Sequence, residues 1–170
     1  MLKTLRLALL SGFCVLSFPA FAETAQEISS HGNWTAYYFM ENGEKVCYMA
    51  SEPDKHEGKY TSRGDIAAMI THWPAKDSKD VFSYVAGYDY KKGSDVTVSV
   101  GGETFTLFTQ GEMAWAADES TDKRLMQAIK KGSIMVVKGT SARGTLTTDT
   151  YSLKGSSAAY DAISKTCRVR

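Results

Sequence analysis

The segment from Lys138 to Cys167 decides the fold and reads K-G-T-S-A-R-G-T-L-T-T-D-T-Y-S-L-K-G-S-S-A-A-Y-D-A-I-S-K-T-C. Its threonine-rich part, which begins and ends near glycines, predicts a long strand from Gly144 to Leu153, since threonine favours strands. Gly155 ends that pattern, and the serines and small apolar residues after it predict a short helix over 158–164. This helix leads directly to Cys167, so the segment can close the domain.

The N-terminus has the pattern of a secretory signal peptide. Lys3 and Arg6 precede an apolar run over 7–18, and Ala20-Phe21-Ala22 supplies the small residues of a cleavage site. We therefore predict a signal peptide over 1–22 that is cleaved after Ala22, and a periplasmic or secreted protein. The run is shorter than the roughly 20 residues of a spanning helix, so we expect no transmembrane segment. Cys14 falls inside this leader; lipidation of Cys14 is an alternative that the residues after it do not favour.

Length and charge limit the classes of function. Cleavage after residue 22 leaves 148 of the 170 residues, enough for one domain. Loss of Lys3 and Arg6 changes the formal net charge from +1 to −1. A nearly neutral domain lacks the clustered cations that nucleic acids and anionic membrane surfaces require, so we expect neither as a partner.

Two cysteines remain outside the leader, Cys47 and Cys167. Because exported proteins meet an oxidising compartment, a disulfide between them is the simplest interpretation. It would close a loop of about 120 residues and stabilise the fold by roughly 4 to 5 kcal/mol in the chain-entropy treatment. Two free thiols with a redox or metal-binding role are the alternative, but no C-x-x-C spacing supports it.

In the rest of the chain, apolar and polar residues alternate as they do in β proteins. We predict one hairpin around Asn42-Gly43 and a second around Gly101-Gly102. Further strands are expected over 66–73, 80–90 and 133–138. Acidic residues at the start, lysines at the end and a following glycine predict a helix over 121–131. The fold class is therefore mainly β: an antiparallel β-sandwich or flattened barrel with two short helices. Residues 23–32 are predicted to be a flexible arm, and 33–170 a single domain.

No arrangement of reactive residues predicts catalysis. His31, His56 and His72 are scattered over separate segments, so we expect no metal site, and no cofactor motif is present. No nucleophile motif such as G-x-S-x-G occurs. The acidic pairs Asp118/Glu119 and Asp149/Asp161 could serve acid–base chemistry only if folding brought each pair to a reacting group. We predict that the protein is not an enzyme.

One segment offers a possible binding surface. Hydroxyls and a guanidinium follow one another along the strand edge and could bind an anion or a sugar; the residues are Thr140, Ser141, Arg143, Thr145 and Thr147. The alternative is that these threonines only fill a solvent-exposed strand face.

Several segments together resemble a known family. They are G-N-W-T at 32–35, K-V-C-Y-M-A-S at 45–51, A-K-D-S-K-D-V-F-S-Y-V-A-G-Y at 75–88, G-G-E-T-F-T-L-F-T-Q-G-E-M-A-W-A at 101–116 and G-T-S-A-R-G-T-L-T-T-D-T-Y-S-L-K-G-S-S-A-A at 139–159, with a terminal cysteine. This pattern is similar to the invasion-associated locus B family of alphaproteobacteria, over nearly the whole chain after the leader. The chain departs from the family in having Ser156 where an aromatic residue is usual.

The resemblance implies a small periplasmic or surface β-rich protein, in a family named for host-cell entry but also found in free-living bacteria. It implies no catalytic residues. We predict a non-enzymatic protein that binds a macromolecule of the bacterial envelope or of a host surface. The alternative is a small-ligand-binding or inhibitor module that uses a pocket or an exposed loop such as 51–65.

Overall fold

The computed structural model describes residues 24–169. The predicted signal peptide and its cleavage after Ala22 lie outside the described residues. Between residues 24 and 169 the strands are β1 (Gln26–His31), β2 (Trp34–Glu41), β3 (Glu44–Ser51), β4 (Lys55–Gly58), β5 (Ala67–Trp73), β6 (Ser78–Val85), β7 (Val96–Val100), β8 (Glu103–Gln110), β9 (Met113–Trp115), β10 (Ile134–Thr140) and β11 (Leu146–Ser152). The helices are the 3₁₀ turn η1 (Pro74–Lys76), α1 (Glu119–Lys131) and α2 (Ser156–Cys167).

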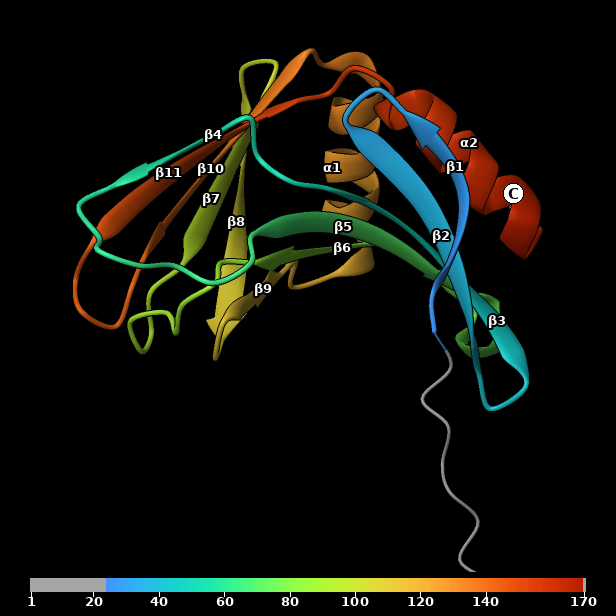
Figure 1. The fold of residues 1–170 in the computed structure, drawn as a ribbon, viewed down its shortest axis with the longest axis horizontal. Coiled ribbons are helices and arrows are strands. Elements are labelled where there is room, and N and C mark those ends of the chain that lie inside the picture. Colours follow the sequence, from blue (N-terminus) through green and yellow to red (C-terminus); the bar gives the residue numbers. More distant parts are fainter. Residues whose placement is uncertain (1–23, 170) are drawn as a thin grey trace, which may run out of the picture.

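The strands form one antiparallel sheet that does not close on itself. Their order is β1-β2-β3-β5-β6-β9-β8-β7-β10-β11-β4. The sheet bends strongly, so that β1, β2 and β3 form one limb of an arch and β7, β10, β11 and β4 form the other, while α1 and α2 lie on the outside of the arch (Figure 1). The predicted mainly antiparallel architecture with two helices is confirmed, as an open, folded-over sheet.

Successive side chains of each strand point to alternate sides, which gives the sheet two distinct faces. Side chains on one face are buried with the helices in a single core, which includes Trp34, Met49, Ile70, Phe82 and Tyr151. Residues that alternate with them along each strand point to the opposite face. The core does not include the large side chains of this second face.

Helix α1 begins and ends close to the bounds of the helix that the sequence predicted over 121–131. The Asp118 carboxylate accepts a hydrogen bond from the Thr121 N–H at 2.9 Å, which caps the first turn. Lys130 and Lys131 lie in the last turn, where the helix dipole favours cations. The buried positions Leu125, Met126 and Ile129 fall on one side, as the helical period requires.

Helix α2 begins where the chain packs most tightly. Gly155 has φ of +95°, and a Cβ atom there would lie 1.8 Å from the His31 carbonyl oxygen, so only glycine fits. Ser156 is buried and donates a hydrogen bond to the Ile129 carbonyl at 3.2 Å. This serine therefore joins the start of α2 to α1 by a polar contact.

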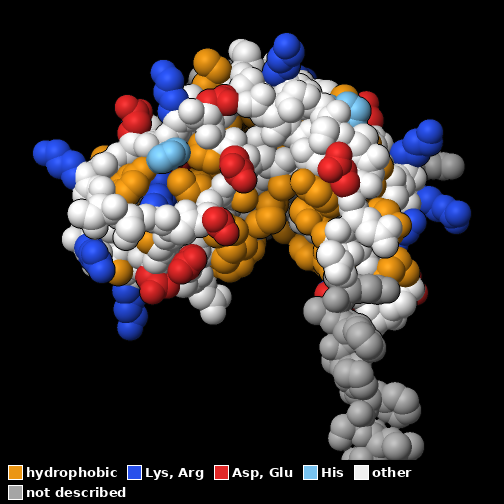
Figure 2. Space-filling view, in the orientation of Figure 1, with side chains coloured by type: hydrophobic (Ala, Val, Ile, Leu, Met, Phe, Trp, Pro, Cys, Tyr) orange, Lys and Arg blue, Asp and Glu red, His pale blue; other side chains and the backbone are white. Residues whose placement is uncertain are grey.

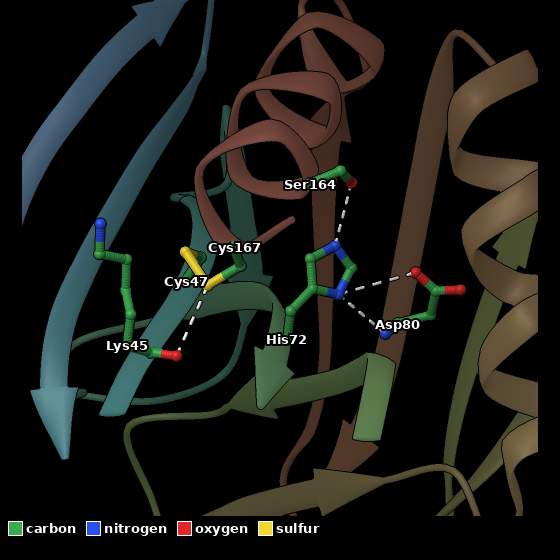
Figure 3. Close-up of a disulfide and its surroundings, with 6 residues drawn as sticks. All are labelled: Lys45, Cys47, His72, Asp80, Ser164 and Cys167. Atoms are coloured by element: carbon green, nitrogen blue, oxygen red, sulfur yellow. Dashed lines mark hydrogen bonds and ion pairs between the residues drawn. A yellow bond between two sulfur atoms is a disulfide. The ribbon is translucent and has the colours of Figure 1, made fainter. Parts of the chain in front are cut away.

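The C-terminal end of α2 is covalently attached to the sheet. Cys47 of β3 and Cys167 form the predicted disulfide, with Cα atoms 5.9 Å apart (Figure 3). Beside it, His72 of β5 lies between Ser164 of α2 and Asp80 of β6. The His72 Nδ1 accepts from the Asp80 N–H at 3.1 Å, which leaves the proton of the neutral ring on Nε2, 3.1 Å from the Ser164 hydroxyl. Burial lowers the pKa of His72, although the Asp80 charge acts in the opposite direction.

Two segments that we expected to be irregular are strands. Within the predicted flexible arm 23–32, residues 26–31 form β1, which pairs with β2 and has Ile28 packed against the core. Within the loop 51–65, β4 pairs with the edge of β11, with Gly58 opposite Thr147. Both strands are polar and mostly exposed, so they carry little hydrophobic periodicity; distant backbone partners stabilise them instead.

Candidate functional site

A cavity lies at the tip of the limb that contains β10 and β11. Its volume is about 640 Å³, and it is lined by residues 59–64, 87–89 and 141–143, with Thr145 and Thr147. We call it the loop cavity. The loop after β4, the loop after β6 and the β10–β11 hairpin thus supply its walls. At Gly87, where φ is +69°, a Cβ atom would lie 2.5 Å from the Gly64 carbonyl oxygen; glycine therefore lets the two loops touch.

The floor of the loop cavity is a buried ion pair. The Arg63 Nη1 and Nη2 atoms each donate to a carboxylate oxygen of Asp149 at 2.7 Å, and both side chains are at most 3% exposed. The Tyr84 hydroxyl donates to the same carboxylate at 2.5 Å, and Arg63 Nε donates to the Ala86 carbonyl at 2.6 Å. Burial tends to lower the pKa of Arg63, but its bonds to Asp149 outweigh burial and raise that pKa. The Arg63 guanidinium therefore stays charged at physiological pH.

Tyrosine rings hold the Arg63 guanidinium from two directions. Its central carbon lies 4.9 Å from the Tyr88 ring centre and 5.7 Å from that of Tyr60. The Tyr88 hydroxyl is 2.6 Å from the Thr147 hydroxyl. Burial raises the pKa of Tyr88, so its hydroxyl remains protonated and can donate.

Four of the five residues predicted as a binding surface line the loop cavity: Ser141, Arg143, Thr145 and Thr147. Thr140 does not; it is half-buried on β10, opposite Leu146 in the ladder. Arg63, Tyr60 and Tyr88 also line the cavity but were not predicted from the sequence, because they come from loops distant in the chain. Asp149 was the available clue, since a carboxylate in the middle of a predicted strand needs a cation once it is buried.

A second candidate surface is the sheet face opposite the helices. Register places its side chains together: Tyr37 lies opposite Tyr48, Met69 opposite Ser83, and Ser83 opposite Trp115. The large side chains of this face are partly exposed and outside the core cluster. They are Tyr37, Phe39, Tyr48, Met69, Trp73, Val85, Phe108, Met113 and Trp115. We call this set the aromatic face.

The aromatic face lines the inside of the arch. Hydrophobic side chains gather in the hollow beneath β5, β6 and β9, in the orientation of Figure 1 (Figure 2). Tyr37 and Tyr48 stack with ring centres 5.1 Å apart, and Phe108 and Trp115 lie 5.7 Å apart across β8 and β9. Phe108 is 46% exposed. Ring pairs of this kind give a firm apolar surface with few rotatable bonds.

Acidic residues border one end of the aromatic face. Glu52 follows β3, Asp65 precedes β5 and Glu112 precedes β9, and the ladders bring these three strand ends to the same edge of the sheet. All three residues are exposed. Figure 2 shows acidic side chains between the hollow and the rest of the surface. The edge is therefore a region of negative potential beside an apolar face.

The acidic residues considered for catalysis take part in a helix cap or in ion pairs. Asp118 caps α1, and hydrogen bonds from Thr121 lower its pKa. Asp149 pairs with Arg63, whereas Asp161 lies 3.7 Å from Lys130. Among residues 24–169, no group of three or more His, Cys, Asp or Glu side chains is placed to hold a metal ion. Within the same range, no helix is both long and apolar enough to cross a membrane.

Comparison with known proteins supports one family. The crystal structure of invasion associated protein B from Bartonella henselae is similar to this chain with a TM-score of 0.58 and 16% sequence identity, over 82% of this chain and 96% of that one. At this identity the likeness shows the fold alone. No curated protein matches the sequence. A family model described as "Invasion associated locus B (IalB) protein" matches residues 34–164. Because that match covers most of the sequence, the chain belongs to the invasion associated locus B family.

Proposed function

We propose that this protein is an exported, non-enzymatic binding protein that recognises a protein partner of the bacterial envelope or of a host surface through the aromatic face. The observation that carries the proposal is a concave sheet face of nine large apolar side chains that the core does not enclose. Contiguous apolar surface of this kind is uncommon on proteins that act alone, and it marks interaction sites.

The composition of the face favours a protein over a small apolar ligand. Tyrosine, tryptophan, phenylalanine and methionine are the residues enriched at the centres of protein interfaces. The face is an open, curved surface, with a hollow of about 500 Å³ at the edge that includes Thr35, Tyr37 and Ala50. A partner can therefore place a ridge of side chains along the arch.

The acidic edge specifies the charge of that partner. Glu52, Asp65 and Glu112 have no ion-pair partner among residues 24–169. A segment with apolar residues followed by lysine or arginine would bury its apolar part on the aromatic face and place its cations at this edge. We therefore infer an apolar segment with a basic flank as the bound element.

Export is supported by two independent features. Residues 1–22 have the sequence pattern of a secretory signal peptide. The Cys47–Cys167 disulfide belongs to the described structure, and such bonds persist mainly in oxidising compartments. Both are consistent with a periplasmic or secreted protein that meets envelope or host components.

Site-specific photo-cross-linking tests the proposed interface. A benzoylphenylalanine is placed at Phe108 on the aromatic face, or at the control position Ile134, which is also apolar and is 56% exposed. We expect an envelope or host-surface protein to be cross-linked from Phe108 and not from Ile134. The cross-linked peptide should contain apolar residues beside lysine or arginine. Neutralising Glu52, Asp65 and Glu112 to amides should reduce the yield several-fold.

Three outcomes would contradict the proposal. Equal products from Phe108 and Ile134 would mean that contacts are non-specific. Cross-links to a second copy of this chain alone would make the face a self-association surface. A partner that binds with undiminished yield after Trp115→Lys would show that it uses another surface.

One observation favours a second candidate function, that of a small-ligand module. The loop cavity exceeds the roughly 300 Å³ at which small-molecule sites begin. Its lining combines hydroxyls and charged groups with the apolar surface of the Tyr60 and Tyr88 rings. The two candidate functions use different surfaces, so a test of one does not decide the other.

A further inference from the structure

We propose that the loop cavity binds an acidic saccharide, with Arg143 and Lys59 contacting the sugar carboxylate. This site is separate from the aromatic face and does not depend on the partner proposed there. Its volume of about 640 Å³ falls in the range of small-ligand sites and is sufficient for a disaccharide.

Unpaired cations at the cavity specify an anionic ligand. Arg143 and Lys59 line the cavity, are exposed, and have no ion-pair or hydrogen-bond partner among residues 24–169. The third lining cation, Arg63, is neutralised by Asp149. Two free cations thus face one lining carboxylate, Asp89, and the net positive charge attracts an anion.

Asp89 and the hydroxyls distinguish a sugar from a simple anion. A carboxylate in the cavity repels every anion, but it also accepts hydrogen bonds from sugar hydroxyls, which offset that repulsion for a sugar acid and which sulfate cannot donate. The Ser141 hydroxyl oxygen accepts from the Thr145 N–H at 3.1 Å, so its proton remains available to a ligand. Such a mixture of donors and acceptors matches a ring that carries several hydroxyls as well as one carboxylate.

The cavity also has apolar surface and rigidity. Tyr60 and Tyr88 line it, and their rings are held against the Arg63 guanidinium. The exposed part of a tyrosine ring offers an apolar surface to the C–H face of a sugar. Arg63 has five N–H donors, and one on Nη1 has no partner among the described residues. The floor is therefore prearranged before a ligand enters, which reduces the entropy cost of binding.

Titration calorimetry of the purified protein tests the proposal with three probes: a disaccharide of glucuronic acid and N-acetylglucosamine, the neutral disaccharide of N-acetylglucosamine, and inorganic phosphate. We expect the acidic disaccharide to bind at least tenfold more tightly than the neutral one, and phosphate not to bind measurably. Arg143→Gln and Lys59→Gln should each weaken binding of the acidic probe by about tenfold. The control Lys131→Gln, an exposed lysine of α1, should leave it unchanged.

The variants are at exposed positions, so a correctly folded protein is expected, and a far-ultraviolet circular dichroism spectrum checks this. Equal affinity for the acidic and neutral probes would overturn the role of the two cations. Binding of phosphate without either saccharide would overturn the assignment to sugars. Absence of binding for all three probes at millimolar concentration would overturn the site itself.

Discussion

The buried pair between Arg63 and Asp149 gives the sharpest prediction about stability. The Asp149 carboxylate is 1% exposed and accepts two bonds from Arg63 and one from Tyr84. Asp149→Asn keeps the size of the side chain but leaves the guanidinium buried without a counter-charge. Removal of one partner from a buried pair typically costs 3–5 kcal/mol. We expect a loss of about 3 to 4 kcal/mol, because Arg63 retains its bond to the Ala86 carbonyl.

The same reasoning predicts that removing both charges costs much less. The double variant Arg63→Met/Asp149→Leu leaves no uncompensated charge, so its stability should lie within about 2 kcal/mol of the parent protein. The surface pair Lys130–Asp161 provides the control. Asp161 is 74% exposed and its distance to Lys130 is 3.7 Å, so Asp161→Asn should cost less than about 0.5 kcal/mol.

Urea unfolding followed by circular dichroism, without reducing agent, measures these differences. For a domain of this size, a loss of 3 to 4 kcal/mol corresponds to a fall in Tm of roughly 10 °C. A cost below about 1 kcal/mol for Asp149→Asn would refute the argument that the pair is desolvated. A double variant less stable than Asp149→Asn would refute the argument that the unpaired charge is the source of the loss.

Three further predictions concern the covalent link and pH. Replacing Cys47 and Cys167 by alanine should lower the free energy of unfolding by up to about 5 kcal/mol, because the bond closes a loop of sequence separation 120; urea unfolding measures it. Burial lowers the pKa of His72 below its usual 6.5, so the unfolded chain binds the proton more tightly and stability should fall as pH drops below about 6.5. Unfolding curves of His72→Gln should lack this component. Burial raises the pKa of Asp122 from 3.8 to about 6, so ionisation of this group lowers the stability as pH rises from 3.8 to about 6, and the full cost is present above that pH. Asp122→Asn should therefore stabilise the protein at pH 7.5 by about 1 to 2 kcal/mol and by much less at pH 4, as thermal unfolding at the two pH values would show.

Local patterns predicted most elements because short-range chemistry decides them. The turn at Asn42-Gly43 has φ of 54° and 81° at its two residues, which is the backbone that this dipeptide tolerates. The end of α1 follows from lysines and a glycine in sequence. In contrast, β1 and β4 depend on hydrogen bonds to β2 and β11, and polar edge strands have no apolar alternation from which they could be predicted.

The candidate site was predictable only in part for the same reason. The hairpin residues Ser141, Arg143, Thr145 and Thr147 are close in sequence, so their grouping was visible. Arg63 is 86 residues from Asp149, and no local sequence pattern around either residue predicts that the two form an ion pair.

The sequence by itself determined the β-rich class, the two helices and the pair of cysteines available for a disulfide, because composition and short-range periodicity carry that information. The family was indicated by the resemblance of several segments to its members. Only the tertiary structure decided which face of the bent sheet the helices cover and which face stays open with its aromatic side chains. Two-residue alternation defines two faces of every strand, but both faces of β2, β3 and β5 here are apolar enough to be buried. The choice between them follows from long-range packing, in which α2 is attached through Cys167 to the face that contains Cys47.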